Sequence, residues 1–431
     1  MIKLYQSKEA FFRASSLSQT DTGAIRASVA EIILKVKREK DAALKHYTEL
    51  YDKVILASVA VSVRQIREAE ESLPPDLRVM FEEAIERVRA FHRKQLPKSW
   101  LEETADGSRF GLRFTAIENV GLYVPGGTAA YPSTVIMTAV PAQLAGCKRV
   151  ALASPPGEDG LVNSLVLGVA SLLGIEEVYV VGGVQAVAAL AYGTQSVKRV
   201  DKIVGPGNMY VNEAKRQVFG DVGIDSLAGP TELVVLADDS ANPAWVAQDM
   251  LAQAEHDVET RVICVTTSRD FADTLIQELQ RLVRQGGRAE TLQQALSRGG
   301  AVITVEDLLE GTEVINIIAP EHLQIMTAAP AEILPKIQNA GAIFLGDWSP
   351  AVVGDYCAGP NHVLPTDGSA RFSSPLGVMD FMKFSSVFHY SEQAFRNAAL
   401  TTSLFADIEK LPNHKKAIDC RYEQNSCSNK A

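Results

Sequence analysis

The sequence predicts an α/β protein with two parallel-sheet domains and with helical extensions at its N-terminal and C-terminal ends. Between residues 118 and 346, short β-rich runs end in glycine-rich turns, and segments with helical character follow them. Strand, turn and helix in this regular order are typical of right-handed parallel α/β units. Because the pattern continues over so much of the chain, we expect two sheets rather than one.

The N-terminal part of the chain is expected to be mostly helical. Apolar residues spaced by about 3.6 positions predict a helix over residues 22–49. Ser62 and Gln65 have the spacing of a capping box, so a helix is expected to start there. A further helix is expected over residues 75–93.

The middle of the chain contains the alternating pattern. Its β-rich runs are NVGLYVPGG, RVALASPPG, EEVYVVGG and DKIVGPGN, and each leads into a helical segment. The runs RVICVTTSRD, GAVITVEDL and GAIFLGD extend the pattern. Beyond Pro375 the sequence becomes helical again, and it ends in the polar segment YEQNSCSNKA.

Composition excludes several classes of partner. The formal net charge of −10 argues against nucleic acid and against an anionic membrane, because both require a basic surface. No window offers the ~20 uninterrupted apolar residues that cross a bilayer, and MIKLYQSKEAFFRA lacks the apolar core of a signal peptide. The 5 cysteines are scattered, which is typical of a reducing compartment. We therefore expect a cytoplasmic protein.

Three glycine-rich turns are candidate ligand sites: PGGT (125–128), VGGVQ (181–185) and GPGN (205–208). Glycine allows the backbone to approach a ligand, and the helix that follows favours an anion at its N-terminus. The dinucleotide fingerprint G-x-G-x-x-G is absent, and one such turn is weak evidence because tight turns in any α/β protein favour glycine. Three turns at successive strand ends favour a nucleotide or phosphate ligand.

Two polar segments could contribute to a metal site. In LAQAEHD, late in a helix that begins near Pro243, Gln253 and His256 are three residues apart and share one face. The alternative, a polar helix end in which His256 interacts with the helix dipole, is favoured on this segment alone. In GDYCAGPNH, Asp355 and His362 lie on a loop, where an Asx turn and a surface histidine explain them equally well.

A third segment, DIEKLPNHKK, places Glu409 and His414 on either side of a break at Pro412. Locally, the favoured interpretation is a charged helix end followed by a new helix that Asn413 caps.

The histidines gather in these segments. Of the 7 histidines, four lie in polar clusters, whereas His46 and His92 are interpreted as incidental and His389 as a core residue. Imidazole together with carboxylate and amide oxygen suits zinc, with manganese or cobalt as substitutes. From spacing alone, a metal site is the less favoured hypothesis.

The segment IIAPEHLQIM sets Glu321 directly beside His322 in an apolar frame that a solvated loop does not require. The two side chains either cap a buried helix or form a pair of proton-transferring groups held out of water. The apolar neighbours expected to provide the desolvated setting are Ile317, Ile318, Leu323 and Ile325.

Over nearly its whole length, the chain resembles the histidinol dehydrogenase family. The segments that carry the resemblance are GLYVPGGTAAYPST, VGGVQAVAALAYGT, DKIVGPGN, IDSLAGPTE, QAEHD, APEHL and GDYCAGPNHVLPT, in that order. The resemblance implies an NAD-dependent homodimer with one zinc ion (Zn2+) per subunit. Its reaction takes L-histidinol through L-histidinaldehyde to L-histidine, the last two steps of histidine biosynthesis, and reduces two NAD.

The resemblance also implies roles for individual residues. The implied metal ligands are Gln253, His256 and Asp355 of one subunit and His414 of the other. The implied substrate contacts are those same ligands with Thr231, His322, His362 and Glu409. The implied NAD contacts are Tyr123, Gln185 and Asn208. The implied site is thus shared between subunits, and Glu409 would complement the positive charge of the substrate.

The domain organisation that we expect contains two Rossmann-like domains. Its parts are a small N-terminal segment (1–20), a main α/β domain with the metal and proton-transfer residues (21–127 plus 232–376), an NAD-binding domain (128–231) and a helical C-terminal domain that reaches the partner subunit (377–431).

On this basis Glu321 and His322 are interpreted as two bases. His322 would remove the alcohol proton, and Glu321 would activate the water that attacks the aldehyde. Both would work partly desolvated, where the pKa of a carboxylate rises. A covalent route through Cys357 is less favoured, because it leaves Glu321 without a task and nothing nearby in the sequence lowers the pKa of that thiol.

Two other functions remain open. A related zinc- and NAD-dependent dehydrogenase could act on another small polyol or on a hydroxy-sulfonate, although Glu409 favours histidinol. A non-catalytic nucleotide-binding or regulatory protein on the same scaffold would be expected to have lost the Glu321–His322 pair, which is intact.

Overall fold

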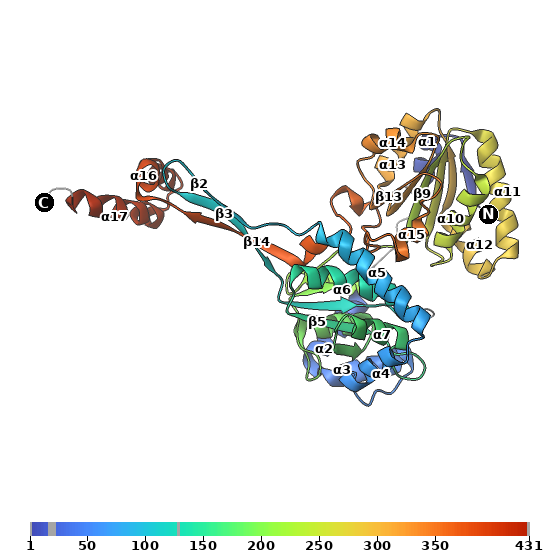
Figure 1. Cartoon of the computed structure of the whole chain (residues 1–431), viewed down its shortest axis with the longest axis horizontal. Helices are drawn as coiled ribbons and strands as arrows, with labels where there is room; N and C mark the ends of the chain where they lie inside the picture. The colour runs from blue at the N-terminus through green and yellow to red at the C-terminus, as the bar shows by residue number, and fades with distance from the viewer. Residues whose placement is uncertain (1, 16–22, 127–129, 429–431) are drawn as a thin grey trace. The chain divides into compact units, whose positions relative to one another are not determined.

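The computed structural model describes residues 2–15, 23–126 and 130–428 of the chain. The chain divides into two compact units, the first comprising residues up to Leu96 and Ile117–Phe381, the second Pro97–Ala116 and the residues from Met382 onward. Figure 1 shows the elements in chain order. Among the described residues, no helix is both long and apolar enough to span a bilayer.

The first unit contains a parallel six-stranded sheet, which we call sheet A. Its strands, in order across the sheet, are β1 (Lys3–Tyr5), β11 (Gly300–Thr304), β10 (Arg261–Thr266), β9 (Glu232–Ala237), β12 (His322–Met326) and β13 (Ala342–Leu345). The helices of this part are α1 (Lys8–Ser15), α10 (Pro243–Ala254), α11 (Arg269–Gln285), α12 (Ala289–Arg298), α13 (Leu308–Ile318), α14 (Pro330–Ile333) and α15 (Ala351–Tyr356).

Helices cover both faces of sheet A (Figure 1). Successive side chains of a strand point to opposite faces, so Leu233 of β9 packs with α10, α11 and α12, whereas Val234 packs with α1, α13 and α14. Burial on both faces explains why the central strands read as continuous apolar runs.

The first unit also contains a parallel five-stranded sheet, sheet B. Its strands, in order across the sheet, are β6 (Glu177–Val180), β5 (Arg149–Ser154), β4 (Asn119–Tyr123), β7 (Lys202–Val204) and β8 (Gly223–Ile224). The helices that follow its strands are α6 (Pro132–Ala145), α7 (Ser164–Leu172), α8 (Gly183–Tyr192) and α9 (Met209–Val218). The strand order reverses beside β4, and such a reversal is where open α/β sheets bind ligands. The prediction of two parallel sheets is confirmed.

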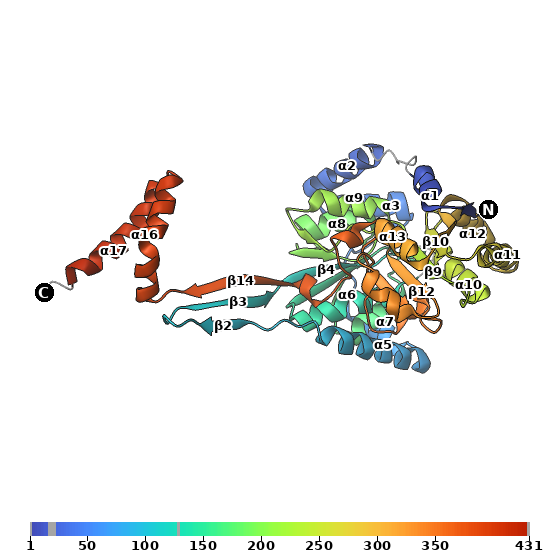
Figure 2. The same cartoon turned by 90° about the horizontal axis from the view of Figure 1, so that it is seen from above.

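Four N-terminal helices pack against the sheet B layer: α2 (Gly23–Glu39), α3 (Asp41–Asp52), α4 (Val63–Glu71) and α5 (Pro75–Arg93). Helix α2 contacts α8 and α9 (Figure 2), α4 contacts α7, and α5 contacts α6. The predicted helix over residues 22–49 is two helices, because Lys40 takes a left-handed φ of 54° between them. The capping box of Ser62 and Gln65 and the helix over residues 75–93 are confirmed.

These contacts differ from the expected domain division. We expected residues 21–127 to join residues 232–376, but β4 is hydrogen-bonded within sheet B, and the N-terminal helices pack on the helices of that sheet. The sequence of a helix predicts that one face is apolar, but it does not predict which of two sheets that face will pack against.

The second unit contains a three-stranded antiparallel sheet in the order β14 (Met382–His389), β3 (Arg109–Ala116) and β2 (Trp100–Glu103), followed by α16 (Glu392–Ile408) and α17 (Pro412–Ser428). The sequence predicts a helical C-terminal domain over residues 377–431, and this expectation is wrong for β14. The strand pairs with a partner far away in sequence, which local patterns do not reveal. His389 of β14 is exposed in this chain rather than a core residue.

Candidate functional site

Glu321 and His322 lie at the amino end of β12, beside the amino end of the neighbouring strand β9 of sheet A. Helix α13 ends at Ile318, Ala319 takes a left-handed conformation, and His322 is already the first residue of β12. The register pairs His322 with Leu233 of β9. Neither polar side chain is an N-cap, so the capping interpretation is wrong.

The backbone of Glu232 positions both side chains. The Glu232 N–H donates to Glu321 Oε2 over 2.9 Å, and His322 Nδ1 lies 3.0 Å from the Glu232 carbonyl oxygen, to which it donates. When the ring is neutral, this hydrogen bond keeps the proton on Nδ1 and leaves His322 Nε2 as the atom that can accept one. It lies 3.7 Å from Asp355 Oδ1, and Nδ1 lies 3.5 Å from Glu321 Oε2.

The pair is desolvated, as expected. Glu321 and His322 are 7% and 4% exposed, and the ring of Phe344 stacks on His322 with centroids 6.1 Å apart. Of the expected apolar neighbours, Ile318, Leu323 and Ile325 are buried, whereas Ile317 is 50% exposed because it lies on the outer face of α13. Burial by itself lowers the pKa of His322, but the carboxylates of Glu321 and Asp355 outweigh it and raise that pKa to about 10.

Gln253 and Asp355 meet beside this pair. Gln253 is buried near the end of α10, and its Nε2 donates to Asp355 Oδ2 over 3.3 Å. Gln253 Oε1 is buried and has no hydrogen-bond partner among the described residues. Burial tends to raise the pKa of Asp355, but His322, and to a smaller extent His362 and His256, hold that pKa below its usual range.

Two local expectations about these residues need correction. Asp355 lies in the short helix α15 rather than on an irregular loop. Helix α10 ends at Ala254, so His256 lies beyond it, exposed, in the turn that leads into β10. Gln253 and His256 therefore do not share a helix face. They lie close together because of the turn after the helix, in which the His256 N–H donates to the Gln253 carbonyl.

His362 and Thr231 complete the group in the first unit. His362 Nδ1 donates to the Asp355 carbonyl over 2.7 Å, and Nε2 lies 3.5 Å from the hydroxyl of Thr134 in the first turn of α6. Burial lowers the pKa of His362. Thr231 is half-buried directly before β9, where its carbonyl accepts the Arg261 N–H over 2.9 Å. Residues of sheet A and of the sheet B layer thus meet at this point.

The donor atoms fit a divalent cation in part. The described residues contain no cluster of three or more His, Cys, Asp or Glu side chains that could hold a metal. The first unit supplies an unpartnered buried amide oxygen on Gln253, the carboxylate of Asp355, and the nearby imidazole of His256. Oxygen and nitrogen donors of this kind suit zinc, which in proteins generally takes four ligands. At least one ligand must therefore come from elsewhere.

The predicted substrate contact Glu409 and the predicted metal ligand His414 belong to the second unit. Glu409 is the C-cap residue directly after α16, and His414 lies in the first turn of α17; both side chains are exposed. Helix α17 begins at Pro412, so Asn413 is its second residue, and the expectation that Asn413 caps this helix is wrong.

The glycine-rich turns follow β4, β6 and β7 at the carboxyl edge of sheet B. Positions 127 and 128 of the PGGT turn lie outside the described residues. Tyr123, at the end of β4, is buried, its hydroxyl accepts the Gly183 N–H over 3.1 Å, and burial raises its pKa to about 12. Gln185 is buried in the first turn of α8. Asn208 caps α9 by accepting two backbone N–H groups.

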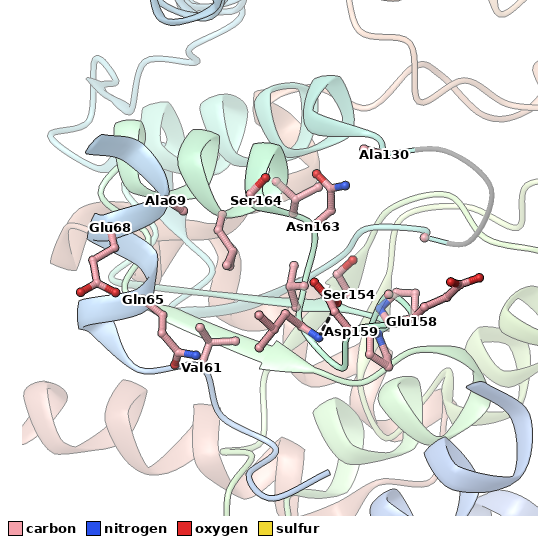
Figure 3. A pocket seen from close by; sticks show the side chains of 18 of the residues that line it. Val61, Gln65, Glu68, Ala69, Ala130, Ser154, Glu158, Asp159, Asn163 and Ser164 are labelled. Atoms are coloured by element: carbon pink, nitrogen blue, oxygen red, sulfur yellow. Dashed lines mark hydrogen bonds between the residues drawn. The ribbon is translucent and has the colours of Figure 1, made fainter. Parts of the chain in front are cut away.

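A pocket of about 690 Å³ opens at the same edge, beyond the ends of β4 and β5. In Figure 3, Ser154 lines it at the end of β5, Asn163 and Ser164 line it at the start of α7, and Gln65 of α4 lines another side. Pro125 borders it as well, which makes it continuous with the first glycine-rich turn. Sequence reasoning missed this pocket, because segments distant in sequence form its walls.

Two cysteines and one further histidine differ in how far they are buried. Cys264 is buried as expected, and burial raises the pKa of its thiol. Cys357 is exposed. His92, interpreted as incidental, is fully buried, and its Nε2 lies 3.5 Å from the amide nitrogen of Asn361, the neighbour of His362. The helical spacing of the apolar residues of α5 indicates that His92 lies on the buried face of this helix, but the sequence does not predict its contact with Asn361.

Comparisons with known proteins agree on one family. The model of the family described as histidinol dehydrogenase matches residues 15–422. The chain is 47% identical to the histidinol dehydrogenase of Bacillus subtilis (strain 168) over 396 residues, 92% of this chain and 93% of the relative. It is 47% identical to that of Geobacillus kaustophilus (strain HTA426) over 399 residues, 93% and 94% of the two chains. The crystal structure of histidinol dehydrogenase from Elizabethkingia anophelis matches with a TM-score of 0.92 and 34% identity, over 99% of both chains.

Proposed function

The chain belongs to the histidinol dehydrogenase family, oxidoreductases of histidine biosynthesis, and from this we propose how its residues carry out the reaction. The substrate is L-histidinol, and two NAD accept the hydrides in succession. The observation that carries the proposal is the buried Glu321–His322 pair, which the backbone of Glu232 orients beside Asp355 and the unpartnered amide oxygen of Gln253.

His322 acts in the first oxidation. Its Nδ1 is engaged by the Glu232 carbonyl, so Nε2 takes the proton of the substrate hydroxyl while the carbon-bound hydride passes to NAD. The product is L-histidinaldehyde. Phe344 and the apolar strand around His322 exclude water from this step.

Glu321 acts in the second oxidation. Its Oε2 is fixed by the Glu232 N–H, and the buried carboxylate removes a proton from the water that adds to the aldehyde carbon. The resulting hydrate loses a hydride to the second NAD and becomes the carboxylate of L-histidine. Over both steps, L-histidinol, two NAD and water give L-histidine, two NADH and the released protons.

The metal ligands are Gln253, His256 and Asp355, together with His414 of the partner subunit. A zinc ion held there would bind the imidazole and amine of the substrate, and would offset the carboxylate charge of Asp355 that raises the pKa of His322. Thr231 and His362 contact the substrate from the first unit. Their positions support these contacts: Thr231 lies directly before β9, and His362 lies beside Asp355, whose carbonyl accepts its Nδ1–H.

NAD binds at the carboxyl edge of sheet B. Tyr123, Gln185 and Asn208 contact it. Tyr123 and Asn208 are supported by their place where β4 and β7 end, on either side of the reversal in strand order, and Gln185 by its place near Gly183, whose N–H the Tyr123 hydroxyl accepts. The adjoining pocket of about 690 Å³ has the size of a small-molecule site.

The active unit is a homodimer, in which Glu409 and His414 complete the site of the partner subunit. Support comes from α16, which carries large apolar side chains at helical spacing on an uncovered face. These are Leu400 (71% exposed), Leu404 (54%), Ile408 (78%) and, just beyond the helix, Leu411 (38%). An apolar stripe of this kind on a surface helix marks a protein interface.

Product stoichiometry tests this function. Purified protein with limiting L-histidinol and excess NAD should form two NADH per L-histidinol, measured by absorbance with L-histidine quantified in parallel. One NADH per substrate would indicate a related dehydrogenase of a polyol or hydroxy-sulfonate, and none would indicate a non-catalytic binding protein. Either result would overturn the proposal.

A further inference from the structure

A buried ion pair holds the third glycine-rich turn. Lys215 of α9 donates from Nζ to the Gly205 carbonyl over 3.0 Å and pairs with Asp225, which follows β8. Asp225 Oδ2 in turn accepts the Gly205 N–H over 2.7 Å. Side chains of opposite charge therefore fix both polar backbone groups of one glycine.

Gly205 needs this support because its conformation is unusual. Its φ is +123°, a value that side chains rarely allow, and a Cβ built there would lie 2.1 Å from the Tyr123 carbonyl oxygen. The end of β7 thus packs directly against the backbone at the end of β4. The turns that follow these two strands flank the reversal in strand order.

The Lys215–Asp225 ion pair also helps to fix the position of Asn208. Lys215 lies on α9, the helix that Asn208 caps, so the ion pair ties this helix to the turn before it. Asn212 of α9 adds a second tie, since its amide donates to the Gly207 carbonyl over 2.8 Å and accepts the Ala228 N–H over 3.1 Å. The whole GPGN turn is held from α9 and from the segment after β8.

Stability alone is a weak reason for such a pair. The Lys215 and Asp225 side chains are 0% and 4% exposed. Removing two charges from water costs so much that a buried ion pair is often no better than apolar residues of similar volume. The geometry instead points to a requirement for the shape of the turn.

We propose that Lys215 and Asp225 are positioning residues for NAD binding, which set the GPGN turn so that Asn208 and Tyr123 meet the dinucleotide. The inference rests on the proposed function, because it assumes NAD at this edge. It predicts that loss of the ion pair weakens NAD binding even in protein that remains folded.

The test compares charge removal with stability. In the double variant Lys215→Met/Asp225→Leu, both charges are gone and apolar side chains fill the space, so loss of the ion pair itself should cost little stability. The N–H and carbonyl of Gly205 lose their partners, so the melting temperature should fall by a few degrees while the protein stays folded. Its dissociation constant for NAD, measured by calorimetry, should rise by about tenfold or more, because the turn that leads to Asn208 loses the charge-assisted hydrogen bonds that hold it in shape. KM for NAD should rise in parallel, with KM for L-histidinol unchanged.

Two further variants separate a positioning role from a purely structural one. Lys215→Met/Asp225→Asn keeps an acceptor for the Gly205 N–H and should recover part of the NAD affinity. Arg216→Met, on the exposed side of the same helix, should bind NAD normally. If the folded Lys215→Met/Asp225→Leu protein binds NAD as tightly as the unmodified protein, the inference is wrong. If the unmodified protein fails to bind NAD, the proposed function fails first.

Discussion

Replacement of Glu321 by glutamine separates the two oxidations. Glutamine has nearly the same shape, and its amide oxygen can accept the Glu232 N–H that Glu321 Oε2 accepts over 2.9 Å. The backbone bond is therefore kept, and the free energy of unfolding should change by no more than about 1 kcal/mol. The substitution removes the ability of this buried side chain to take a proton, and it also removes one of the two carboxylate charges that raise the pKa of His322.

The size of the effect follows from what a general base contributes. A positioned base is worth roughly 10²- to 10⁴-fold in rate, which corresponds to about 3 to 5 kcal/mol of activation free energy. Because Glu321 serves only the hydration of the aldehyde, this loss should fall on the second oxidation. Alcohol oxidation by His322 should continue at a rate within a few-fold of the original.

Stopped-flow measurements of NADH formation test the separation. With L-histidinol, Glu321→Gln should form close to one NADH per active site rapidly and the second very slowly. With added L-histidinaldehyde and NAD, only the slow phase should appear. Equal loss of both phases would refute the assignment of separate bases, and an unchanged second phase would show that Glu321 does not activate water.

Two other predictions concern neighbouring residues. His322→Asn should lose alcohol oxidation by roughly 10²-fold or more with its zinc content unchanged by elemental analysis; loss of zinc would make His322 a ligand instead. Burial raises the pKa of Glu232 from 4.5 to about 7, so the folded state binds this proton more tightly. Stability should therefore fall by about 3 kcal/mol as pH rises through that window. Urea unfolding of Glu232→Gln at pH 5 and pH 8 should show a smaller fall than the unmodified protein, and an equal fall would contradict the assignment.

Local signals in the sequence predicted the parallel sheets and the chemical nature of the site. Glycine-rich turns after β-rich runs mark strand ends, and the Glu321–His322 pair in an apolar frame is desolvated as expected. The burial of the Gln253 amide follows from its place late in an amphipathic helix, although His256 lies beyond the helix end.

Contacts over long sequence separations could not be predicted. The role of Glu232 depends on the register of β9 and β12, which no local pattern sets. Lys215 looks like a surface lysine on a charged helix, yet it is completely buried because Asp225, from the segment after β8, faces it. Strand β14 pairs with β3, which lies far away in the sequence. Because local patterns do not show such a pairing, the sequence predicts helix where this strand lies.

Complementation between two inactive variants tests the central claim, which is that one site takes ligands from two chains. A Gln253→Leu variant and a His414→Ala variant should each lack activity. After unfolding and refolding as an equal mixture, half of the dimers contain one of each chain, and one of their two sites is intact, so activity should return to about a quarter of the unmodified level. A mixture that forms mixed dimers but stays inactive would contradict the shared site.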